Sequence, residues 1–215
     1  MDSNNISLQG CDFSSKDYWE NRYKSSGNSG SGSYHNLAMF KAEVLNQLFE
    51  QCKIKSVIEF GCGDGNQLGL LKCQRYIGLD VSLTAIEQCR SLYKGDKSKS
   101  FFLYDYRGFI DNAGLFKQEC AISLDVLYHL VEDEVYESYI RHLFSSAGKL
   151  VVIYAADFDH IQVAKHVLYR RFTKYVKENI LGWTMEFTIK NKYPAKGFDD
   201  DQGSMADFFV YIKNL

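Results

Sequence analysis

The chain has 215 residues, a length that suggests one domain with at most a small appendage. Its formal net charge is only −2, which argues against binding of nucleic acid over the whole surface, because neutralisation of phosphates by Lys and Arg dominates that affinity. The six cysteines form no CxxC pair, so free thiols in a reducing compartment are expected rather than a disulfide framework or a zinc site.

The sequence carries no pattern typical of export or membrane insertion. The polar N-terminus lacks a basic segment followed by an apolar one. The longest apolar run, residues 150–156, has about a third of the length that a bilayer requires. We therefore expect a soluble, cytoplasmic protein with no membrane partner.

The first segment of the chain differs in composition from the rest. Residues 15–23, SKDYWENRY, predict a short helix that Ser15 can cap. The stretch SSGNSGSGS, residues 25–33, is flexible by composition and is either a linker or a loop that orders over a ligand. Residues 1–33 are thus expected to form a frayed tail, a short helix and a Gly/Ser-rich lid, followed by the main domain over residues 34–215.

Helical periodicity and strand-like apolar runs alternate along the main domain. Helices are expected at residues 34–52, 66–72, 82–93, 131–146 and 168–180, and strands at 56–60, 75–80, 100–105, within 115–125, and at 149–157, 184–193 and 207–214. Such alternation predicts right-handed βαβ units and a parallel sheet with helices on both faces. The last two strands have no clear helix between them and are expected to pair antiparallel.

Three glycines follow the first strand at alternate positions: Gly61, Gly63 and Gly65. Glycine permits positive φ and lets a ligand approach the backbone, and ligands bind at the carboxyl ends of strands in open α/β sheets. A tight turn with nothing bound is the alternative. Asn66 and Gln67 stand where a P-loop needs Lys and Ser or Thr, and the order GxGxG differs from the GxGxxG of dinucleotide-binding turns.

Acidic residues stand at the ends of the expected strands. Glu59, two residues before the first glycine, would repel a phosphate and suits a cationic or zwitterionic ligand. Asp80 follows the glycines at nearly the interval, about 20 residues, at which an acid binds a ribose diol. Asp105 and Asp125 end two further strands. Each could be an ordinary turn residue, but their common placement favours a binding site.

The stretches VIEFGCGDGNQL, YIGLDVS, FFLYDY and SLDVLYHL together resemble the motifs of class I S-adenosylmethionine-dependent methyltransferases. The resemblance implies an α/β fold, a Rossmann-like three-layer sandwich with a mostly parallel seven-stranded sheet whose last strand is antiparallel. It implies S-adenosyl-L-methionine as cofactor and S-adenosyl-L-homocysteine as product. The short link between the first two strands departs from the family pattern, so the first helix of the main sheet is expected to be stubby.

The same resemblance implies roles for individual residues. Asp80 would bind the ribose hydroxyls, Asp105 would accept from the adenine amino group, and Tyr106 would flank the ring. The YWENRY segment resembles an N-terminal helix whose aromatic and Arg side chains lie over the cofactor. The expected cofactor-binding residues are Trp19, Arg22, Glu59, Phe60, Gly61, Cys62, Gly63, Asn66, Gln67, Asp80, Val81, Asp105, Tyr106 and Asp125.

The family reaction is an in-line displacement of a methyl group from a sulfonium, in which positioning supplies much of the catalysis. An oxygen nucleophile also needs a base, for which His129 is the candidate, with a structural histidine as the alternative. Asp125 is the second catalytic candidate; it would bind the methionine end of the cofactor or orient the nucleophile. Asp125, Asp157 and Asp159 could imitate a metal site, but isolated loop acids are usually solvated, and no metal is expected.

The absence of one sequence motif narrows the range of possible methyl acceptors. Family members that methylate amino groups of adenine or glutamine carry an Asn/Asp-Pro-Pro-aromatic stretch after the fourth strand, and LDVLYHL has no proline. We expect a small-molecule or sugar acceptor methylated at oxygen, and no nucleic-acid partner. The alternatives are a non-catalytic domain of the same fold that binds cofactor or partner, and an NAD-dependent oxidoreductase. Residues 196–204 are a second lid candidate.

Overall fold

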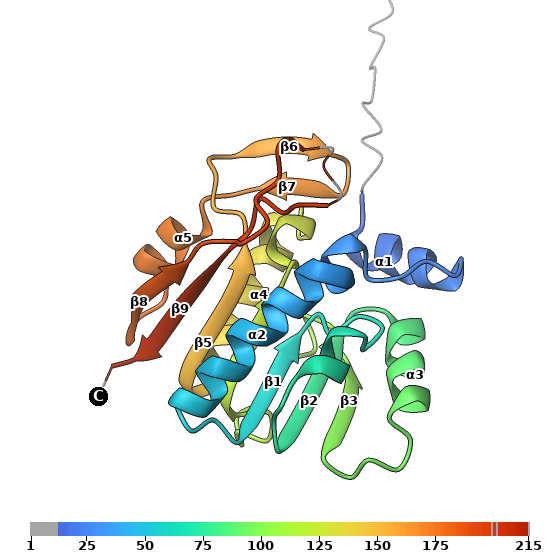
Figure 1. The fold of residues 1–215 in the computed structure, drawn as a ribbon, viewed down its shortest axis with the longest axis vertical. Helices are drawn as coiled ribbons and strands as arrows, with labels where there is room; N and C mark the ends of the chain where they lie inside the picture. The colour runs from blue at the N-terminus through green and yellow to red at the C-terminus, as the bar shows by residue number, and fades with distance from the viewer. Residues whose placement is uncertain (1–12, 199, 201, 215) are drawn as a thin grey trace, which may run out of the picture.

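The structure is a computed structural model that describes residues 13–198, 200 and 202–214. A seven-stranded sheet lies between two layers of helices (Figure 1). Its strands run in the order β3-β2-β1-β4-β5-β9-β8. The strands are β1 (Ser56–Phe60), β2 (Arg75–Asp80), β3 (Lys99–Leu103), β4 (Gln118–Leu124), β5 (Ala147–Ala155), β8 (Trp183–Ile189) and β9 (Asp207–Lys213).

Strand direction agrees with the expected sheet. Strands β1 to β5 pair in parallel, whereas β9 runs antiparallel to both of its neighbours, β5 and β8. The prediction of a Rossmann-like, mostly parallel sheet with an antiparallel last strand is therefore confirmed. The order reverses between β1 and β4, so the carboxyl ends of these two strands border the crevice in which open α/β sheets bind ligands.

Two apolar cores fill the space between the sheet and its helices. On one face, α2 (His35–Gln51) and α3 (Leu83–Leu92) cover the strands, and on the other face lie α4 (Asp133–Ser145) and α5 (Phe172–Asn179). Because both faces are covered, all residues of β1 are buried, including Ser56 and Glu59. The polar side chains of this strand thus need partners inside the protein.

Helix ends follow the expected capping chemistry with one difference. Ser82 accepts a hydrogen bond from the N–H of Ala85 and begins α3. Helix α1 (Ser15–Lys24) is capped by Ser14, which accepts from the N–H of Asp17, and not by Ser15. The stubby helix after β1 is a single 3-10 turn, η2 (Gln67–Leu70). Two further 3-10 turns are η1 (Ser31–Ser33) and η3 (Leu127–His129).

The segment after β5 differs from the expectation. The sequence pattern predicts a helix from residue 168, but β6 (Ile161–Ala164) and β7 (Val167–Tyr169) form an antiparallel hairpin there, and α5 begins only at Phe172. The hairpin lies above the carboxyl end of β5 (Figure 1). The helix prediction is therefore wrong for its first third, residues 168–171.

Within the described ranges, no helix is both long enough and apolar enough to cross a bilayer. The cysteines of these ranges, at positions 52, 62, 73, 89 and 120, are free thiols. The frayed tail is expected over residues 1 to about 15, and residues 1–12, with Cys11, lie outside the described residues, as do positions 199 and 201 of the second lid candidate.

Candidate functional site

A cavity of about 680 Å³ opens at the carboxyl ends of β1, β2 and β4. Its size falls within the range of about 300–1,000 Å³ that is usual for small-molecule sites. Most of the residues expected to form the site line it: Trp19, Glu59, Gly61, Cys62, Gly63, Gln67, Asp80, Val81, Asp105, Tyr106, Asp125 and His129. The fold thus brings together side chains that are up to 110 positions apart in the sequence.

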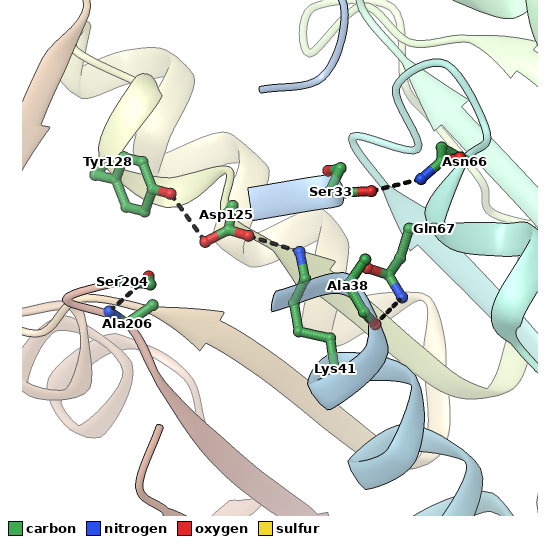
Figure 2. A network of polar contacts seen from close by, with 9 residues as sticks. All are labelled: Ser33, Ala38, Lys41, Asn66, Gln67, Asp125, Tyr128, Ser204 and Ala206. Carbon is green, nitrogen blue, oxygen red and sulfur yellow. Dashed lines mark hydrogen bonds and ion pairs between the residues drawn. The ribbon is translucent and has the colours of Figure 1, made fainter. Parts of the chain in front are cut away.

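Three of the expected cofactor-binding residues are not part of this lining. Arg22 donates from Nε to the carbonyl oxygen of Asn28 at 2.7 Å. Phe60 has no exposed surface and packs among the rings of the second core. Asn66 donates from Nδ2 to the carbonyl oxygen of Ser33 at 2.6 Å (Figure 2). These contacts brace the walls of the cavity, and direct cofactor contacts by these three stay predictions.

The glycines after β1 have positive φ angles of 80°, 57° and 81° for Gly61, Gly63 and Gly65. A Cβ on Gly63 would lie 2.2 Å from the Oγ atom of Ser29, and one on Gly61 would lie 2.4 Å from a methyl of Val126. The bare backbone therefore also makes room for the chain's own residues 25–33, which the sequence did not indicate.

Asp64, inside the glycine turn, holds residues 25–33 in place. Its Oδ2 accepts from the N–H of Ser29 at 3.0 Å and from the hydroxyl of Tyr34 at 2.8 Å. Its own N–H donates to the Ser29 Oγ at 3.1 Å. Asp64 also lines the cavity, although sequence reasoning missed it. Movement of residues 25–33 as a lid stays a prediction.

Helix α1 is fastened at two points beside the cavity. The N–H of Ser15 donates to Glu132 at 2.7 Å. Further along the helix, Glu20 accepts from the hydroxyls of Ser82 at 2.6 Å and Thr84 at 2.9 Å. Burial would raise the pKa of Glu20, but these hydrogen bonds outweigh it and lower the pKa to about 2. Trp19, between the two attachments, contributes its ring to the cavity wall.

Glu59 and Asp80 are the buried acids of the cavity. Glu59 accepts from the hydroxyl of Tyr76, yet burial raises its pKa to about 7. Asp80 accepts at 2.9 Å from the N–H groups of Gly63 and Ser82, and burial still raises its pKa to about 6. Both carboxyls therefore gain or lose a proton close to neutral pH, and a cation in the cavity would favour the ionised forms.

Asp105 and Tyr106 line the cavity and lie just after β3. Oδ1 of Asp105 accepts from the N–H of Arg107 at 3.0 Å, which lowers the pKa of this carboxyl, and Oδ2 accepts from Lys16 at 3.4 Å. Tyr106 donates to Glu134 at 3.3 Å. Lys16 belongs to α1, so the helix also contacts this part of the cavity wall.

Asp125 carries an ion pair that the sequence did not predict. Lys41, on the buried face of α2 and with no exposed surface, places its Nζ 2.6 Å from Oδ2 of Asp125 (Figure 2). The other oxygen of Asp125 accepts from the hydroxyl of Tyr128 at 2.9 Å. Asp125 itself has a φ of 60°, in the left-handed region that residues other than glycine seldom adopt. Such strain is typical of functional sites.

His129 also lines the cavity. Its Nδ1 lies 2.9 Å from the carbonyl oxygen of His166, and its ring meets the ring of Trp19 edge-on, with 4.9 Å between centroids. Burial lowers the pKa of His129 to about 4, so the imidazole is neutral at physiological pH. A neutral imidazole has a free lone pair that can accept a proton, but the lowered pKa makes His129 a weaker base than an ordinary histidine.

The acids that could imitate a metal site have other partners. Asp157 accepts from the N–H and hydroxyl of Thr173, and Asp159 pairs with Arg171. Among the described residues, no group of three or more His, Cys, Asp or Glu side chains is placed to hold a metal ion.

The lining of the cavity is strongly acidic. Its carboxylates are Glu59, Asp64, Asp80, Asp105, Asp125, Glu132 and Glu134, whereas its only Lys or Arg side chains, among the described residues, are Lys16 and Arg107. Lys41 offsets the charge of Asp125 from behind the wall. Such a surface favours a cationic ligand and opposes the pyrophosphate of a dinucleotide.

Replacement of Gly63 by Ala is expected to displace residues 25–33, because the new Cβ would overlap Ser29 and Tyr23. Trypsin should then cleave faster after Lys24, and the chain should unfold at lower urea concentration. Gly95→Ala is the matched control, because Gly95 has a φ of 89° but a Cβ there would meet no atom within 4 Å. Equal effects of the two substitutions would contradict the contact.

Several solved structures resemble this fold. The methyltransferase domain of bacterial CtHen1-C is 20% identical, with a TM-score of 0.65 over 84% of this chain and 100% of that chain. Magnesium protoporphyrin IX methyltransferase (ChlM) from Synechocystis PCC 6803, solved with bound SAM, is 16% identical, with a TM-score of 0.64 over 95% of this chain and 100% of that chain.

The N-methyltransferase NodS from Bradyrhizobium japonicum WM9, in complex with S-adenosyl-L-homocysteine, is 16% identical, with a TM-score of 0.59 over 82% of this chain and 85% of that chain. No protein-family model matches the sequence, and no curated protein matches it. The strand order, the antiparallel β9 and these structural matches show that the chain has the class I S-adenosylmethionine-dependent methyltransferase fold.

Proposed function

We propose that the chain is a methyltransferase that binds S-adenosyl-L-methionine in the acidic cavity and methylates a small-molecule or sugar acceptor at oxygen. The observation that carries the proposal is the cavity beside the glycine turn, in which Glu59 and Asp80 are buried without a basic side chain among the residues that bind them. A cation bound nearby favours the ionised form of such buried carboxyls, and the sulfonium and α-amino group of the cofactor supply positive charge.

The residues of the cavity fit this cofactor along its length. Asp105 and Tyr106 suit the adenine amino group and ring. Asp80 has spare lone pairs beside its two N–H donors with which to accept from ribose hydroxyls. Near the glycine turn, Gln67 donates its amide to the carbonyl of Ala38 (Figure 2), while its Oε1 is buried without a hydrogen-bond partner in the described part of the chain. That oxygen is a spare acceptor for an amino group.

The chain's own groups would prepare the acceptor. The cofactor supplies a methyl group on a positively charged sulfur, and the remaining work is to hold, orient and deprotonate the acceptor. Asp125, fixed by Lys41 and Tyr128, offers an oriented carboxylate at the cavity wall. His129, neutral in this environment, would take the proton of an acceptor hydroxyl.

The fold alone does not select the acceptor. The structural matches differ in the reactions for which they are named. One is a magnesium protoporphyrin IX methyltransferase, one is an N-methyltransferase, and one is a small RNA methyltransferase, HEN1. Our proposal of a hydroxyl acceptor rests on the place of His129 in the cavity lining, together with Asp125, and on the missing proline stretch after β4. Free thiols at the described cysteines suit a reducing compartment, and we propose the cytoplasm.

Calorimetric titration of the full chain with S-adenosyl-L-homocysteine and with NAD⁺ tests the cofactor. We expect binding of the former and not of the latter. Asp80→Ala should weaken binding at least about tenfold, the value of one charge-assisted hydrogen bond. Asp96→Ala is the control, because Asp96 lies in the turn before β3 and is not part of the cavity lining. Unchanged affinity in Asp80→Ala would remove the ribose role.

The alternatives have their own outcomes in the same experiment. Tight binding of NAD⁺ would support an oxidoreductase instead. Binding of S-adenosyl-L-homocysteine without its formation from S-adenosyl-L-methionine and any hydroxyl acceptor tried would favour a non-catalytic domain of the same fold.

A further inference from the structure

The turn of the β6–β7 hairpin reaches the residue expected to act as base. The hairpin lies above the sheet, beyond the carboxyl end of β5 (Figure 1), and its turn consists of Lys165 and His166. The carbonyl oxygen of His166 is the group that lies 2.9 Å from Nδ1 of His129. A contact from a backbone atom of one element thus bears on the chemistry of a side chain of another.

This contact decides which nitrogen of His129 carries the proton. A carbonyl oxygen can only accept a hydrogen bond, so Nδ1 must be the donor. A neutral imidazole has a single N–H, and Nε2 is then left with a free lone pair. No described residue hydrogen-bonds to Nε2, and the ring lines the cavity. In water a neutral histidine side chain favours the opposite form, with the proton on Nε2.

Several contacts hold the turn in place. The ring of His166 is nearly parallel to two other rings, that of Tyr18 at 4.4 Å and 13° and that of His129 at 5.7 Å and 8°. Gln162 donates from its side-chain amide to the carbonyl of Val167 at 3.1 Å and braces the turn from inside. Arg170, just after β7, donates to the carbonyls of Leu130 and Val131 at 2.6 and 2.7 Å. The turn is therefore braced within the hairpin and held to the rest of the chain by His166 and by Arg170.

We propose that the β6–β7 turn is a positioning element of the active site, in which the His166 carbonyl selects the Nδ1–H form of His129 and leaves Nε2 free to accept a proton in the cavity. The use of Nε2 in catalysis rests on the proposed methyltransferase function, whereas the choice of tautomer does not. Without the carbonyl, the favoured form of His129 would place an N–H donor where an acceptor hydroxyl must give up its own proton.

Long-range ¹H–¹⁵N correlation spectra of the full chain, labelled with ¹⁵N-histidine and recorded at pH 7.5, test the tautomer. Loss of one signal set in His129→Gln identifies the residue. We expect His129 to carry its proton on Nδ1, with the Nε2–H form at least about tenfold less populated. His166→Ala removes the ring but keeps the carbonyl, and should keep the tautomer. A proton on Nε2 of His129 in the unaltered chain would overturn the proposal.

Two variants that disturb the carbonyl complete the experiment. Deletion of Lys165 and His166 should lower the ratio of Nδ1–H to Nε2–H by about tenfold. If that variant does not fold, Gln162→Ala, which only loosens the turn, should lower the ratio in the same direction. An unchanged ratio in a folded variant would also overturn the proposal. None of these spectra needs a cofactor, so a chain that fails to bind S-adenosyl-L-homocysteine would reject the proposed function and the catalytic use of Nε2, but would leave the inferred tautomer standing.

Discussion

Replacement of Lys41 by Met is expected to lower the free energy of unfolding by about 3–5 kcal/mol, the usual cost of removing one partner from a buried ion pair. Lys41 has no exposed surface, and its Nζ lies 2.6 Å from a carboxylate that is 13% exposed. Met is unbranched and apolar like the stem of Lys, so the expected loss comes from Asp125, whose charge is left without its partner. Urea unfolding followed by circular dichroism measures the change in midpoint.

Two further variants separate the charge from the loss of packing. In Lys41→Met combined with Asp125→Asn, no charge remains unpaired, and we expect the double variant to recover at least about half of the loss. Lys149→Met is the surface control, because Lys149 pairs with Glu119 at 2.7 Å but is 57% exposed, and should cost no more than about 1 kcal/mol. If Lys41→Met cost no more than Lys149→Met, the ion pair would not be a buried constraint.

The acidic residues at the strand ends are a part of the site that could be predicted from the sequence alone. Asp80, Asp105 and Asp125 are separated along the chain, but each follows or ends a parallel strand. Because parallel strands present their carboxyl ends at one edge of the sheet, the pattern alone predicts that they share a cavity, and all three line it. The strand pattern and the parallel topology are enough to predict that these residues lie close together, even when their individual contacts are unknown.

The β6–β7 hairpin, in contrast, could not be predicted from the local sequence. Its turn, Lys165 and His166, has none of the Gly, Asn or Asp residues that mark tight hairpin turns, and the residues after it have helical apolar spacing. The hairpin instead depends on distant contacts, such as that of Arg170 with the carbonyl of Leu130. No local pattern encodes a contact of that kind.

The position of Lys41 in the sequence could have predicted that it forms a buried ion pair. It lies four residues after Leu37 and three before Val44, on the same apolar face of α2. A lysine at a buried position is almost never unpaired, so its place on that face predicts an acidic partner. The partner itself, Asp125, is 84 positions away and follows only from the packing of α2 over the end of β4. Asp64 offered a weaker signal, an acid within a glycine run.

Glu59 and Asp80 make the affinity for S-adenosyl-L-methionine depend on pH in a defined direction. Burial raises the pKa of Glu59 to about 7 and that of Asp80 to about 6. At acidic pH both carboxyls of the empty cavity therefore hold protons. A sulfonium in the cavity favours the ionised carboxylates, so binding at low pH must release these protons, and that release costs affinity.

The affinity for S-adenosyl-L-methionine is accordingly expected to rise as pH increases from about 5.5 and to level off above about 7.5. From Glu59 alone, the dissociation constant should increase as pH falls below 7, by at most roughly tenfold for each pH unit, with a further contribution from Asp80 below pH 6. His129 does not interfere, because its pKa of about 4 keeps it neutral throughout this interval. Calorimetric titrations at several pH values measure the slope.

The product provides a matched control, because S-adenosyl-L-homocysteine has a neutral sulfur and keeps only the α-amino charge. Its affinity should depend on pH less steeply than that of S-adenosyl-L-methionine. In Glu59→Gln the steep part between about pH 6 and 7.5 should disappear for both ligands, while the part below pH 6 that belongs to Asp80 persists. Equal slopes for the two ligands in the unaltered chain would mean that the positive sulfur does not lie near these carboxyls, and the proposed charge attraction between them would be wrong.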